Sequence, residues 1–368
     1  MKFDRFRLAV LSLSLLVCVN SPLKAQQRQI IISPEVQKDR RVTFRLRAPN
    51  AKDVAVNLQG THAMTKDDEG LWSVTIGPLA PEIYDYDFTV DDLHIVDPSN
   101  GWLKVWLRTS RNVVEVPGDK PMFFEEQLVP HGTIHIHKYP SKSLGVTRNL
   151  YVYTPPGYET SKNTQYPVLY LFHGYGDKED AWTVVGRANL IVDNLLAAKK
   201  AKPLIIVMPY GHTPSAPPVM RSIGNYSSFE RDLVEDVIPY VQTNYLASTE
   251  QKDRAVAGLS MGGGQSLTVG LGHLDLFAWV GAFSSAVPEG ENLEKLLADP
   301  EAINNKLKLL WIGCGKNDFL FQRNQAFFDR LKKDKIKYVA HITEGSHEWR
   351  LWRMYLNEIV PLLFQPDR

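Results

Sequence analysis

A serine stands between glycines in the stretch GLSMGG, which runs from Gly258 to Gly263 with Ser260 near its centre. The residues AVAG before it are typical of a buried strand, and GGGQSLTVGLG after it is typical of a helix. A Gly-x-Ser-x-Gly string between a strand and a helix predicts a sharp turn that exposes the serine hydroxyl. A glycine-rich packing turn is the alternative, but this flanking context favours a nucleophile at Ser260.

A serine hydroxyl needs a base that takes its proton and an acid that orients the base. Asp318 ends the apolar segment LLWIGCGKND, and His347 lies in EGSHEWRLW after the next predicted strand. An α/β-hydrolase places nucleophile, acid and histidine in this chain order. Three other acids compete for the role of Asp318: Glu344, Glu348 and Asp177. The first two lie beside the histidine and are expected to be solvated, and the third lies in a different loop.

An ester-cleaving serine also needs N–H donors for the oxyanion that develops in the transition state. We expect one from the backbone of Met261 and one from the backbone of Tyr175, in the segment YLFHGYGD. His173 in that segment is interpreted as structural rather than catalytic. Trp182 could stack on a planar acyl group or belong to the core, and both interpretations stay open.

These residues belong to a segment, residues 133–368, in which predicted strands alternate with predicted helices. The strands include NLYVYTPPGY, YPVLYLFHG and PLIIVMPYG, and the helices include AWTVVGRANLIVDNLLAAKK and SSFERDLVEDVIPYVQTNY. This alternation predicts a mostly parallel sheet with helices on both faces, the α/β-hydrolase architecture.

The preceding segment, residues 26–116, has a different pattern. The stretches RRVTFRLRAP, DVAVNLQG, GLWSVTIGPL and YDYDFTV alternate apolar and polar residues and are separated by turn residues. Short alternating strands at this spacing predict a small β-sandwich. Residues 117–132, rich in proline and glycine, are expected to link the two domains.

Two tryptophans in GWLKVWLRTS share one face of a predicted strand. Trp102 and Trp106 have the parity of Lys104, whereas Leu103 and Val105 have the opposite parity. We expect the aliphatic side chains to face a core and the tryptophans to contact something outside their own sandwich. That contact is either a sugar ring or the hydrolase domain.

The N-terminus predicts export. Residues 1–25 have a basic start, an apolar run from Leu8 to Val19 that is too short to cross a membrane, and Ala25 at a suitable cleavage point. We therefore expect a periplasmic or secreted protein with a cleaved signal peptide. Lipidation at Cys18 is the less favoured alternative. Cleavage would leave Cys314 as the one cysteine, so the mature chain would have no internal disulfide.

Composition and motifs exclude several function classes. The chain has 368 residues and a formal net charge of +1, which does not suggest a nucleic-acid surface. His135 and His137 alternate on a strand without a cysteine or carboxylate cluster, so we expect no metal site. The glycine turn lacks the lysine of a phosphate-binding loop, and we expect no cofactor.

Many segments of this chain, in order, resemble the feruloyl esterases of carbohydrate esterase family 1, in the esterase D-like branch of the α/β-hydrolases. They include LYLFHGYGDKEDAW, AVAGLSMGGGQSLTVGL, LLWIGCGKND and EGSHEWRLW, and the resemblance covers about residues 130–365. It implies Ser260, Asp318 and His347 as a catalytic triad. It further implies hydrolysis of hydroxycinnamate or acetyl esters on plant xylan, with a cell-wall polysaccharide ester as partner.

The front segment, through FRLRAPNAKDVAVNL and DPSN, is similar to the early-set sandwich of family 48 carbohydrate-binding modules. Enterobactin esterases also combine an early-set domain with this hydrolase fold, so a siderophore ester is an alternative substrate. Acetylxylan esterases and mycolyl transferases share the catalytic pattern, and acetylated xylan is a further alternative. The alternative that is not an enzyme is a carbohydrate-binding protein with an inactive hydrolase domain.

Overall fold

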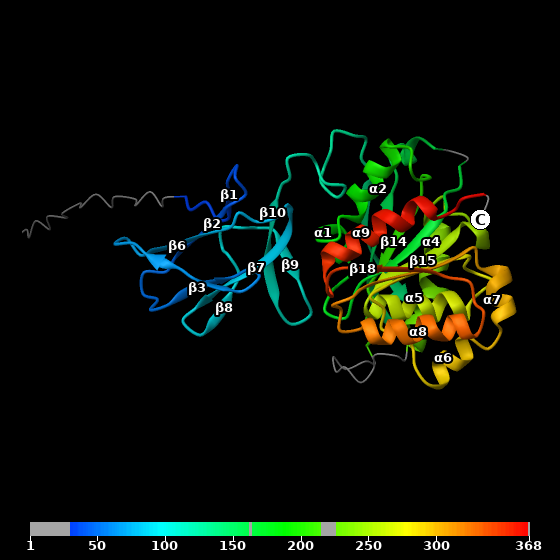
Figure 1. Ribbon diagram of the computed structural model, residues 1–368. Coiled ribbons are helices and arrows are strands. Elements are labelled where there is room, and N and C mark those ends of the chain that lie inside the picture. The colour runs from blue at the N-terminus through cyan, green and yellow to red at the C-terminus, as the bar shows by residue number, and fades with distance from the viewer. Residues whose placement is uncertain (1–29, 162–163, 215–225, 367–368) are drawn as a thin grey trace, which may run out of the picture. The chain divides into compact units, whose positions relative to one another are not determined.

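The computed structural model describes residues 30–161, 164–214 and 226–366, and those of them from Ile32 onward belong to one compact unit (Figure 1). The expected signal peptide and Cys18 lie outside the described residues. Among the residues that are described, no helix has the length and apolar character needed to cross a membrane.

Two antiparallel sheets form the N-terminal part of this unit. One sheet has the strand order β1-β2-β6-β5, and the other has the order β4-β3-β7-β10-β9 with β8 added to β7. The strands are β1 (Glu35–Val36), β2 (Val42–Arg47), β3 (Val54–Asn57), β4 (Thr61–Ala63), β5 (Thr65–Lys66), β6 (Leu71–Ile76), β7 (Glu82–Val90), β8 (Leu93–Ile95), β9 (Leu103–Val105) and β10 (Ser110–Val116).

Alternate residues of both sheets form a common core. Phe44 on β2 and Val56 on β3 are fully buried, and the ring of Phe44 lies 4.7 Å from the ring of Tyr86 on β7. Because period-two alternation buries one face of each sheet against the other, the region is a sandwich. The predicted all-β region at the N-terminus is confirmed.

The second part is built on an eight-stranded sheet with the order β11-β12-β14-β13-β15-β16-β17-β18. Strand β12 is antiparallel to both of its neighbours, β11 and β14. The remaining strands, β14, β13, β15, β16, β17 and β18 in the order of the sheet, are parallel to one another. The strands are β11 (Thr133–Ser141), β12 (Val146–Thr154), β13 (Val168–Phe172), β14 (Ile205–Pro209), β15 (Arg254–Leu259), β16 (Trp279–Phe283), β17 (Leu309–Gly315) and β18 (Val339–Thr343).

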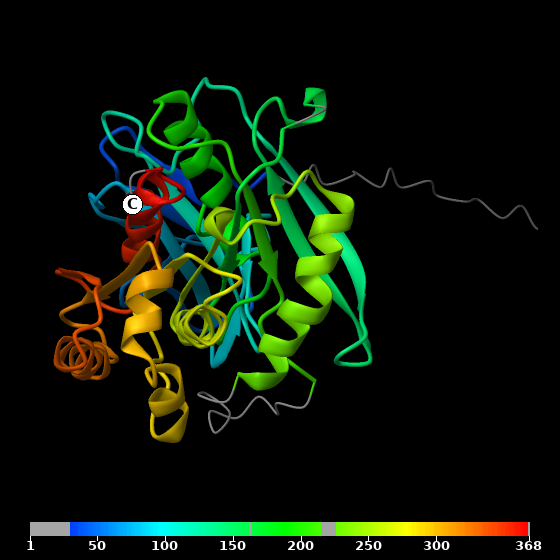
Figure 2. The ribbon, with the colours of Figure 1, turned by 90° about the vertical axis from the view of Figure 1, so that its right-hand side faces the viewer.

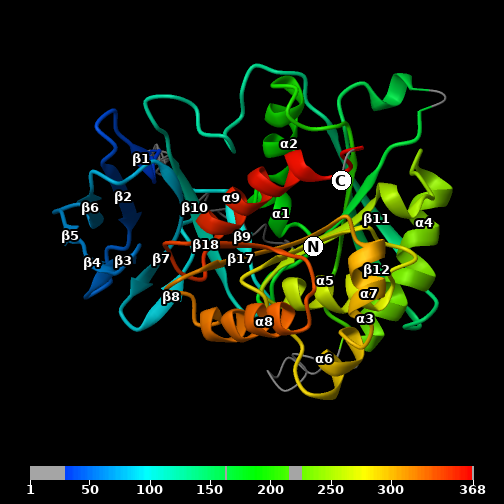
Figure 3. The same cartoon turned by 45° about the vertical axis from the view of Figure 1, so that its right-hand side comes forward.

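The helices are α1 (Ala181–Val184), α2 (Ala188–Ala197), α3 (Ser227–Asp232), α4 (Ile238–Asn244), α5 (Met261–Gly272), α6 (Glu291–Leu296), α7 (Pro300–Lys306), α8 (Phe321–Lys333) and α9 (Trp349–Ile359). Leu169 and Leu171 of β13 share a core with α2 and α9, which lie side by side in Figure 3. Tyr170 and Phe172 of the same strand share the opposite core with α3, α4, α5 and α8 (Figure 2). Helices therefore cover both faces, and the predicted α/β-hydrolase fold is confirmed.

Two predicted helices differ in detail. The helix expected over residues 181–200 is interrupted at Arg187, whose φ of 54° is left-handed, and it becomes α1 and α2. The helix expected over residues 227–245 contains a π-helical turn, Leu233–Val237, between α3 and α4. Pro239 lies just beyond this turn and lacks the N–H that an uninterrupted α-helix would use there.

Residues between β10 and β11 pack on the second part of the unit. Asn194 on α2 donates to the carbonyl groups of Phe123 and Glu125, at 3.0 and 2.9 Å. Phe124 is 1% exposed, and the guanidinium of Arg353 on α9 lies 4.9 Å from the centre of its ring. This segment is therefore fixed against α2 and α9 by hydrogen bonds and burial.

Candidate active site

Ser260 occupies the sharp turn between β15 and α5. Its backbone has φ 54° and ψ −114°, a conformation that a residue with a side chain adopts only where its surroundings impose it. A Cβ at Gly258 would lie 2.5 Å from the carbonyl oxygen of Gly262, and a Cβ at Gly262 would lie 2.6 Å from the carbonyl oxygen of His173. The two glycines are therefore required by the close approach of the backbone.

Neighbouring strands hold the backbone of this serine on both sides. The N–H of Ser260 donates to the carbonyl of Phe283 at the end of β16, at 2.8 Å. Its own carbonyl accepts from the N–H of Gly264 at 3.1 Å and from that of Ala286 at 2.9 Å. The strained turn is thus fixed by the sheet beside it and by the first turn of α5.

Asp318 and His347 form a hydrogen-bonded pair beyond the ends of β17 and β18. The Nδ1 atom of His347 lies 2.8 Å from Oδ2 and 3.0 Å from Oδ1 of Asp318, whose side chain has no exposed surface. The N–H of Leu320 also donates to this carboxylate, at 2.8 Å. Burial alone would raise the pKa of Asp318, but the hydrogen bonds from His347, Leu320 and Ser284, with the charge of the imidazole, lower it overall. The carboxylate therefore stays ionised and can stabilise an imidazolium.

The other face of this pair opens on a cleft of about 1020 Å³, which both Ser260 and His347 line. The imidazole of His347 contacts the rings of Phe319 and Trp352, whose centres lie 4.4 and 4.9 Å from its own. Ser260 and His347, the two groups that sequence analysis expects to exchange a proton, thus line the same cleft.

The competing acids have other partners. Glu344 is exposed and pairs with Lys316 at 2.5 Å, and Glu348 pairs with Arg350 at 2.9 Å. Asp177 is buried beside the loop that follows β13, where its Oδ2 lies 3.2 Å from the position of a Cβ at Gly174. The carboxylate that contacts the Nδ1 atom of His347 is Asp318.

The loop after β13 lies against the serine turn. A Cβ at Gly174 would lie 3.7 Å from the Cβ of Ser260, and Tyr175 lines the same cleft as the serine. The N–H of Met261 belongs to the first turn of α5, whose N–H groups have no acceptor within the helix. Met261 thus directly follows the serine, and Tyr175 lies in the loop that packs against the serine turn.

His173 holds this loop in place. Its Nε2 accepts from the N–H of Gly211 at 2.8 Å, so Nδ1 carries the proton and donates to the carbonyl of Gly174 at 2.8 Å. Burial, then the nearby His212, lowers the pKa of His173 to about 3, which keeps the ring neutral. In a trans peptide the N–H points opposite to the C=O. Fixing the Gly174 carbonyl therefore also fixes the direction of the Tyr175 N–H.

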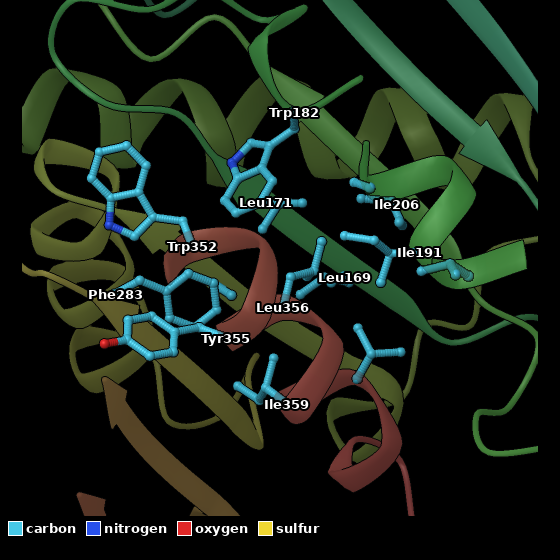
Figure 4. Close-up of a cluster of buried hydrophobic side chains, with 14 of the residues drawn as sticks. Leu169, Leu171, Trp182, Ile191, Ile206, Phe283, Trp352, Tyr355, Leu356 and Ile359 are labelled. Atoms are coloured by element: carbon cyan, nitrogen blue, oxygen red, sulfur yellow. The ribbon is translucent and has the colours of Figure 1, made fainter. Parts of the chain in front are cut away.

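Of the two interpretations of Trp182, the structure supports the core residue and not the substrate-binding one. The side chain is fully buried, its Nε1 donates to the carbonyl of Phe172 at 2.9 Å, and its ring packs on Trp349 and Phe283. Figure 4 shows Trp182 among the buried side chains of the core on the α9 side of the sheet. Its position at the start of α1 turns it inward, away from the cleft.

The tryptophans of the β9 segment have different surroundings. Trp102 is half-buried against the core that contains α2 and α9, and the guanidinium of Arg187 lies 4.3 Å from its ring centre. Trp106 is 36% exposed and lines the cleft with Ser260. The expected burial of the aliphatic parity was wrong, because Lys104 is the buried residue of β9 and Leu103 is only half-buried.

The sandwich also contacts the loop beside the serine; sequence analysis expected a contact between sandwich and hydrolase near Trp106 but did not identify this loop as the partner. The N–H of Leu107 donates to the carbonyl of Gly176 at 3.0 Å. A Cβ at Gly176 would lie 3.8 Å from the ring of Trp106. A second contact between the sandwich and the esterase part is the buried ion pair of Glu82 on β7 with Arg353 on α9. These contacts join residues far apart in the sequence, and no local sequence pattern identifies the two partners of each contact.

No cluster of three or more histidine, cysteine, aspartate or glutamate residues suited to a metal ion occurs within residues 30–161, 164–214 and 226–366.

Comparison with known proteins identifies the family of this chain. The Esterase family model matches residues 141–363, more than half of the chain. This chain belongs to that family. It is accordingly a carboxylic ester hydrolase, and the predicted enzyme class is confirmed.

Two comparisons carry the likeness to feruloyl esterases. An endo-1,4-beta-xylanase/feruloyl esterase of Xylanibacter ruminicola is 33% identical over 344 residues, which is 90% of this chain and 46% of that protein. The chain thus spans less than half the length of this relative. The ferulic acid esterase of carbohydrate esterase family 1 from Anaeromyces mucronatus is 27% identical, with a TM-score of 0.58, over 67% of this chain and 96% of that one. The predicted resemblance to this family is confirmed.

A third comparison covers both parts of the described unit. The enterochelin esterase of Shigella flexneri has a TM-score of 0.68 over 91% of this chain and 95% of that chain, at 19% identity. At this identity the likeness concerns the fold alone. It shows that a sandwich followed by an α/β-hydrolase is an arrangement that another esterase chain shares.

Proposed function

We propose that this enzyme is a serine esterase that hydrolyses feruloyl esters on arabinoxylan, with Ser260, His347 and Asp318 as its triad. The observation that carries the proposal is the ionised, fully buried Asp318 on the Nδ1 atom of His347, whose ring lines one cleft with Ser260. A histidine with an acid on one nitrogen and a serine in the same cleft is the arrangement that activates a hydroxyl.

The proposed reaction has two halves. The hydroxyl of Ser260 attacks the ester carbonyl while Nε2 of His347 takes its proton, and the tetrahedral oxyanion accepts from the N–H groups of Met261 and Tyr175. The imidazolium then protonates the leaving sugar alcohol, which leaves a feruloyl ester on the serine. Water, deprotonated by the same imidazole, attacks that ester, and the imidazolium returns the proton to Ser260 as the bond to the serine breaks and ferulate is released. Asp318 remains ionised throughout and stabilises the imidazolium.

The substrate assignment draws on the relatives. The Xylanibacter ruminicola protein is named a xylanase and feruloyl esterase, and the Anaeromyces mucronatus structure is a ferulic acid esterase. The proposal includes export, with a signal peptide over residues 1–25, since a polysaccharide ester is found outside the cell. It also includes a sandwich domain over residues 26–116 and an esterase domain over residues 133–368, joined by residues 117–132.

A siderophore ester is the second candidate. It is favoured by the enterochelin esterase of Shigella flexneri, which shares both parts of the fold over 91% of this chain. The two candidates differ in the alcohol released, a sugar in one case and a serine derivative in the other. They can therefore be separated by substrate preference.

The test compares kcat/KM for methyl ferulate, acetylated xylan and enterobactin with purified enzyme. We expect hydrolysis of methyl ferulate, and a loss of several orders of magnitude in Ser260→Ala, because the triad acts as a unit. Ser73→Ala, on a sandwich strand away from the cleft, is the matched control and should keep full activity. Near-normal turnover by Ser260→Ala would refute the triad, and turnover of enterobactin alone would establish the second candidate.

A further inference from the structure

Ser284 occupies a strained turn at the end of β16, the strand that lies next to the strand of Ser260 in the sheet. Its φ is 44°, in the left-handed region, and the residue is fully buried. Its N–H donates to the carbonyl of Gly313 on β17 at 2.7 Å. A glycine would adopt this backbone without strain, so the conformation alone does not require a serine. What the serine adds at this position is a hydroxyl.

The residues on either side of Ser284 hold the nucleophile. The carbonyl of Phe283 accepts from the N–H of Ser260 at 2.8 Å, and the N–H of Ala286 donates to the carbonyl of Ser260 at 2.9 Å. Ser284 lies between these two contacts in the sequence, and its own N–H is bonded to β17, the strand that precedes Asp318. This one turn therefore connects the backbone of the nucleophile to the strand that leads to the proposed acid.

The hydroxyl of Ser284 accepts a hydrogen bond from the indole of Trp352. The Nε1 and Oγ atoms are 3.1 Å apart, and the ring of Trp352 lies 4.9 Å from the ring of His347. An indole N–H can only donate, so the hydroxyl is the acceptor in this pair and can donate its own hydrogen to a second group. Two groups interact with the hydroxyl in this way, the carboxylate of Asp318 and the thiol of Cys314.

The carboxylate is the better acceptor of this hydrogen. Burial raises the pKa of Cys314 to about 12, so the thiol keeps its own hydrogen, and its Sγ donates to a backbone carbonyl at 3.7 Å. A neutral sulfur is a weak acceptor, whereas a hydrogen bond to an ionised carboxylate is roughly twice as strong as one between neutral groups. Burial would raise the pKa of Asp318, and the hydrogen bond from Ser284 is one of those that lower it overall.

We propose that Ser284 is a positioning residue of the triad, whose hydroxyl holds together two groups that contact the imidazole of His347, the Asp318 carboxylate and the Trp352 indole. The role is indirect, because the hydroxyl contacts the acid and the indole rather than the ester. The inference rests on the proposed function, since Ser284 acts through the proposed acid. Without the hydroxyl, the buried carboxylate loses a donor and the indole loses its acceptor, so the imidazole is held less firmly toward Ser260.

The experiment measures kcat and KM on p-nitrophenyl acetate and methyl ferulate for Ser284→Ala and Ser284→Gly. In both variants we expect kcat to fall about 10- to 100-fold, the range for one hydrogen bond to a charged group, with KM within about twofold. Because glycine also relieves the left-handed backbone, equal losses in the two variants assign the effect to the hydroxyl. Recovery of kcat in Ser284→Gly would assign the loss to backbone strain and overturn the inference.

Ser285→Ala is the matched control. This neighbouring serine is also fully buried, and its Oγ has no hydrogen-bond partner within the part of the chain that the structure describes, so its removal should leave kcat unchanged. Thermal unfolding shows whether each variant is folded. If Ser284→Ala does not fold, Ser284→Gly, which carries no backbone strain, replaces it throughout.

A double-mutant cycle with Asp318→Asn separates positioning from a general structural effect. If Ser284 acts through the acid, Ser284→Ala should lower kcat by less than about twofold when residue 318 is already asparagine. An equal loss in both backgrounds would overturn the inference, as would a loss below about threefold in the wild-type background. The proposed function fails in a different way. If Asp318→Asn alone keeps full kcat, the acid is wrong and the positioning role falls with it, whereas an inactive Asp318→Asn beside a fully active Ser284→Ala refutes the positioning role alone.

Discussion

Replacing Asp318 by asparagine would isolate the charge of the proposed acid from its shape. The carboxylate lies 2.8 and 3.0 Å from Nδ1 of His347 and accepts from the N–H of Leu320 at 2.8 Å, with no exposed side-chain surface. Asparagine fills the same space, so the packing around it should survive. Its NH₂ group, however, can donate to Nδ1 and leave the proton on Nε2. The imidazole would then be unable to accept the proton of Ser260.

The expected magnitude follows from this tautomer change. An asparagine in place of the triad aspartate, with the geometry kept, reduces kcat about 10⁴-fold in a well-studied serine protease. At about 1.36 kcal/mol per tenfold change in rate, this is roughly 5.4 kcal/mol of transition-state stabilisation. The full burial of Asp318 supports a loss of this size, because no water can replace the carboxylate beside the ring.

The assay is kcat/KM on an aryl ester, with thermal unfolding to show that the variant is folded. Asp329→Asn, an exposed position on α8, is the matched control and should have wild-type activity. A loss of less than about tenfold in Asp318→Asn would refute the assignment of the acid. Glu344→Gln and Glu348→Gln complete the test, because a larger loss in either one would identify that glutamate as the acid instead.

Three further variants test the surroundings of the site. Glu82→Gln leaves Arg353 as an unpaired buried charge and should lower the free energy of unfolding by about 3–5 kcal/mol; a change below about 1 kcal/mol in urea unfolding would contradict this. His173→Phe removes one of two hydrogen bonds to the Gly174 carbonyl, the other coming from the N–H of Asp177 at 3.1 Å, and should lower kcat with little change in KM, with partial recovery in His173→Asn; an unchanged kcat would exclude the positioning role. Burial raises the pKa of Asp177 from 3.8 to about 6, so the folded chain binds this proton more tightly than the unfolded chain and stability falls as pH rises between these values. Asp177→Asn should therefore be more stable than the wild type at pH 8, by up to about 3 kcal/mol, and equal to it below pH 3.8; a constant difference across this range would show that Asp177 does not titrate as described.

The positions of the chemical groups could be predicted because they depend on local patterns. Ser260 stands between a strand and a helix, and Asp318 and His347 each follow an apolar strand of the same parallel sheet. The carboxyl ends of parallel strands meet at one edge of a sheet, so chain order and strand ends are enough to bring such residues together. The alternation of apolar and polar residues along the strands was also enough to predict the sandwich, because each of its sheets buries one face.

Side-chain environments that depend on the other half of the chain could not be predicted. Trp182 and Trp106 are the same residue type, but one is a core residue and the other lines the cleft. The difference arises because each tryptophan packs against residues from a distant part of the chain. The adjacent residues in the sequence do not indicate which distant residues these are. Lys104 has the polar character of an exposed strand residue and yet is 8% exposed, because Trp106 and Asp85 cover it. Strand alternation alone does not indicate that a lysine is buried by contacts of this kind.

The contacts at the loop after β13 connect the sandwich to the proposed active site. The N–H of Leu107 bonds the Gly176 carbonyl, one residue beyond Tyr175, whose own N–H is the proposed oxyanion donor. Asp177, which ends this loop, is buried, and the charge of Lys104 on β9 offsets part of the burial that raises its pKa. His173 holds the same loop from the esterase side through Gly174. One short loop is therefore fixed between a histidine of the esterase and a strand of the sandwich, so that displacement of either support changes the direction of the N–H that would bind the oxyanion.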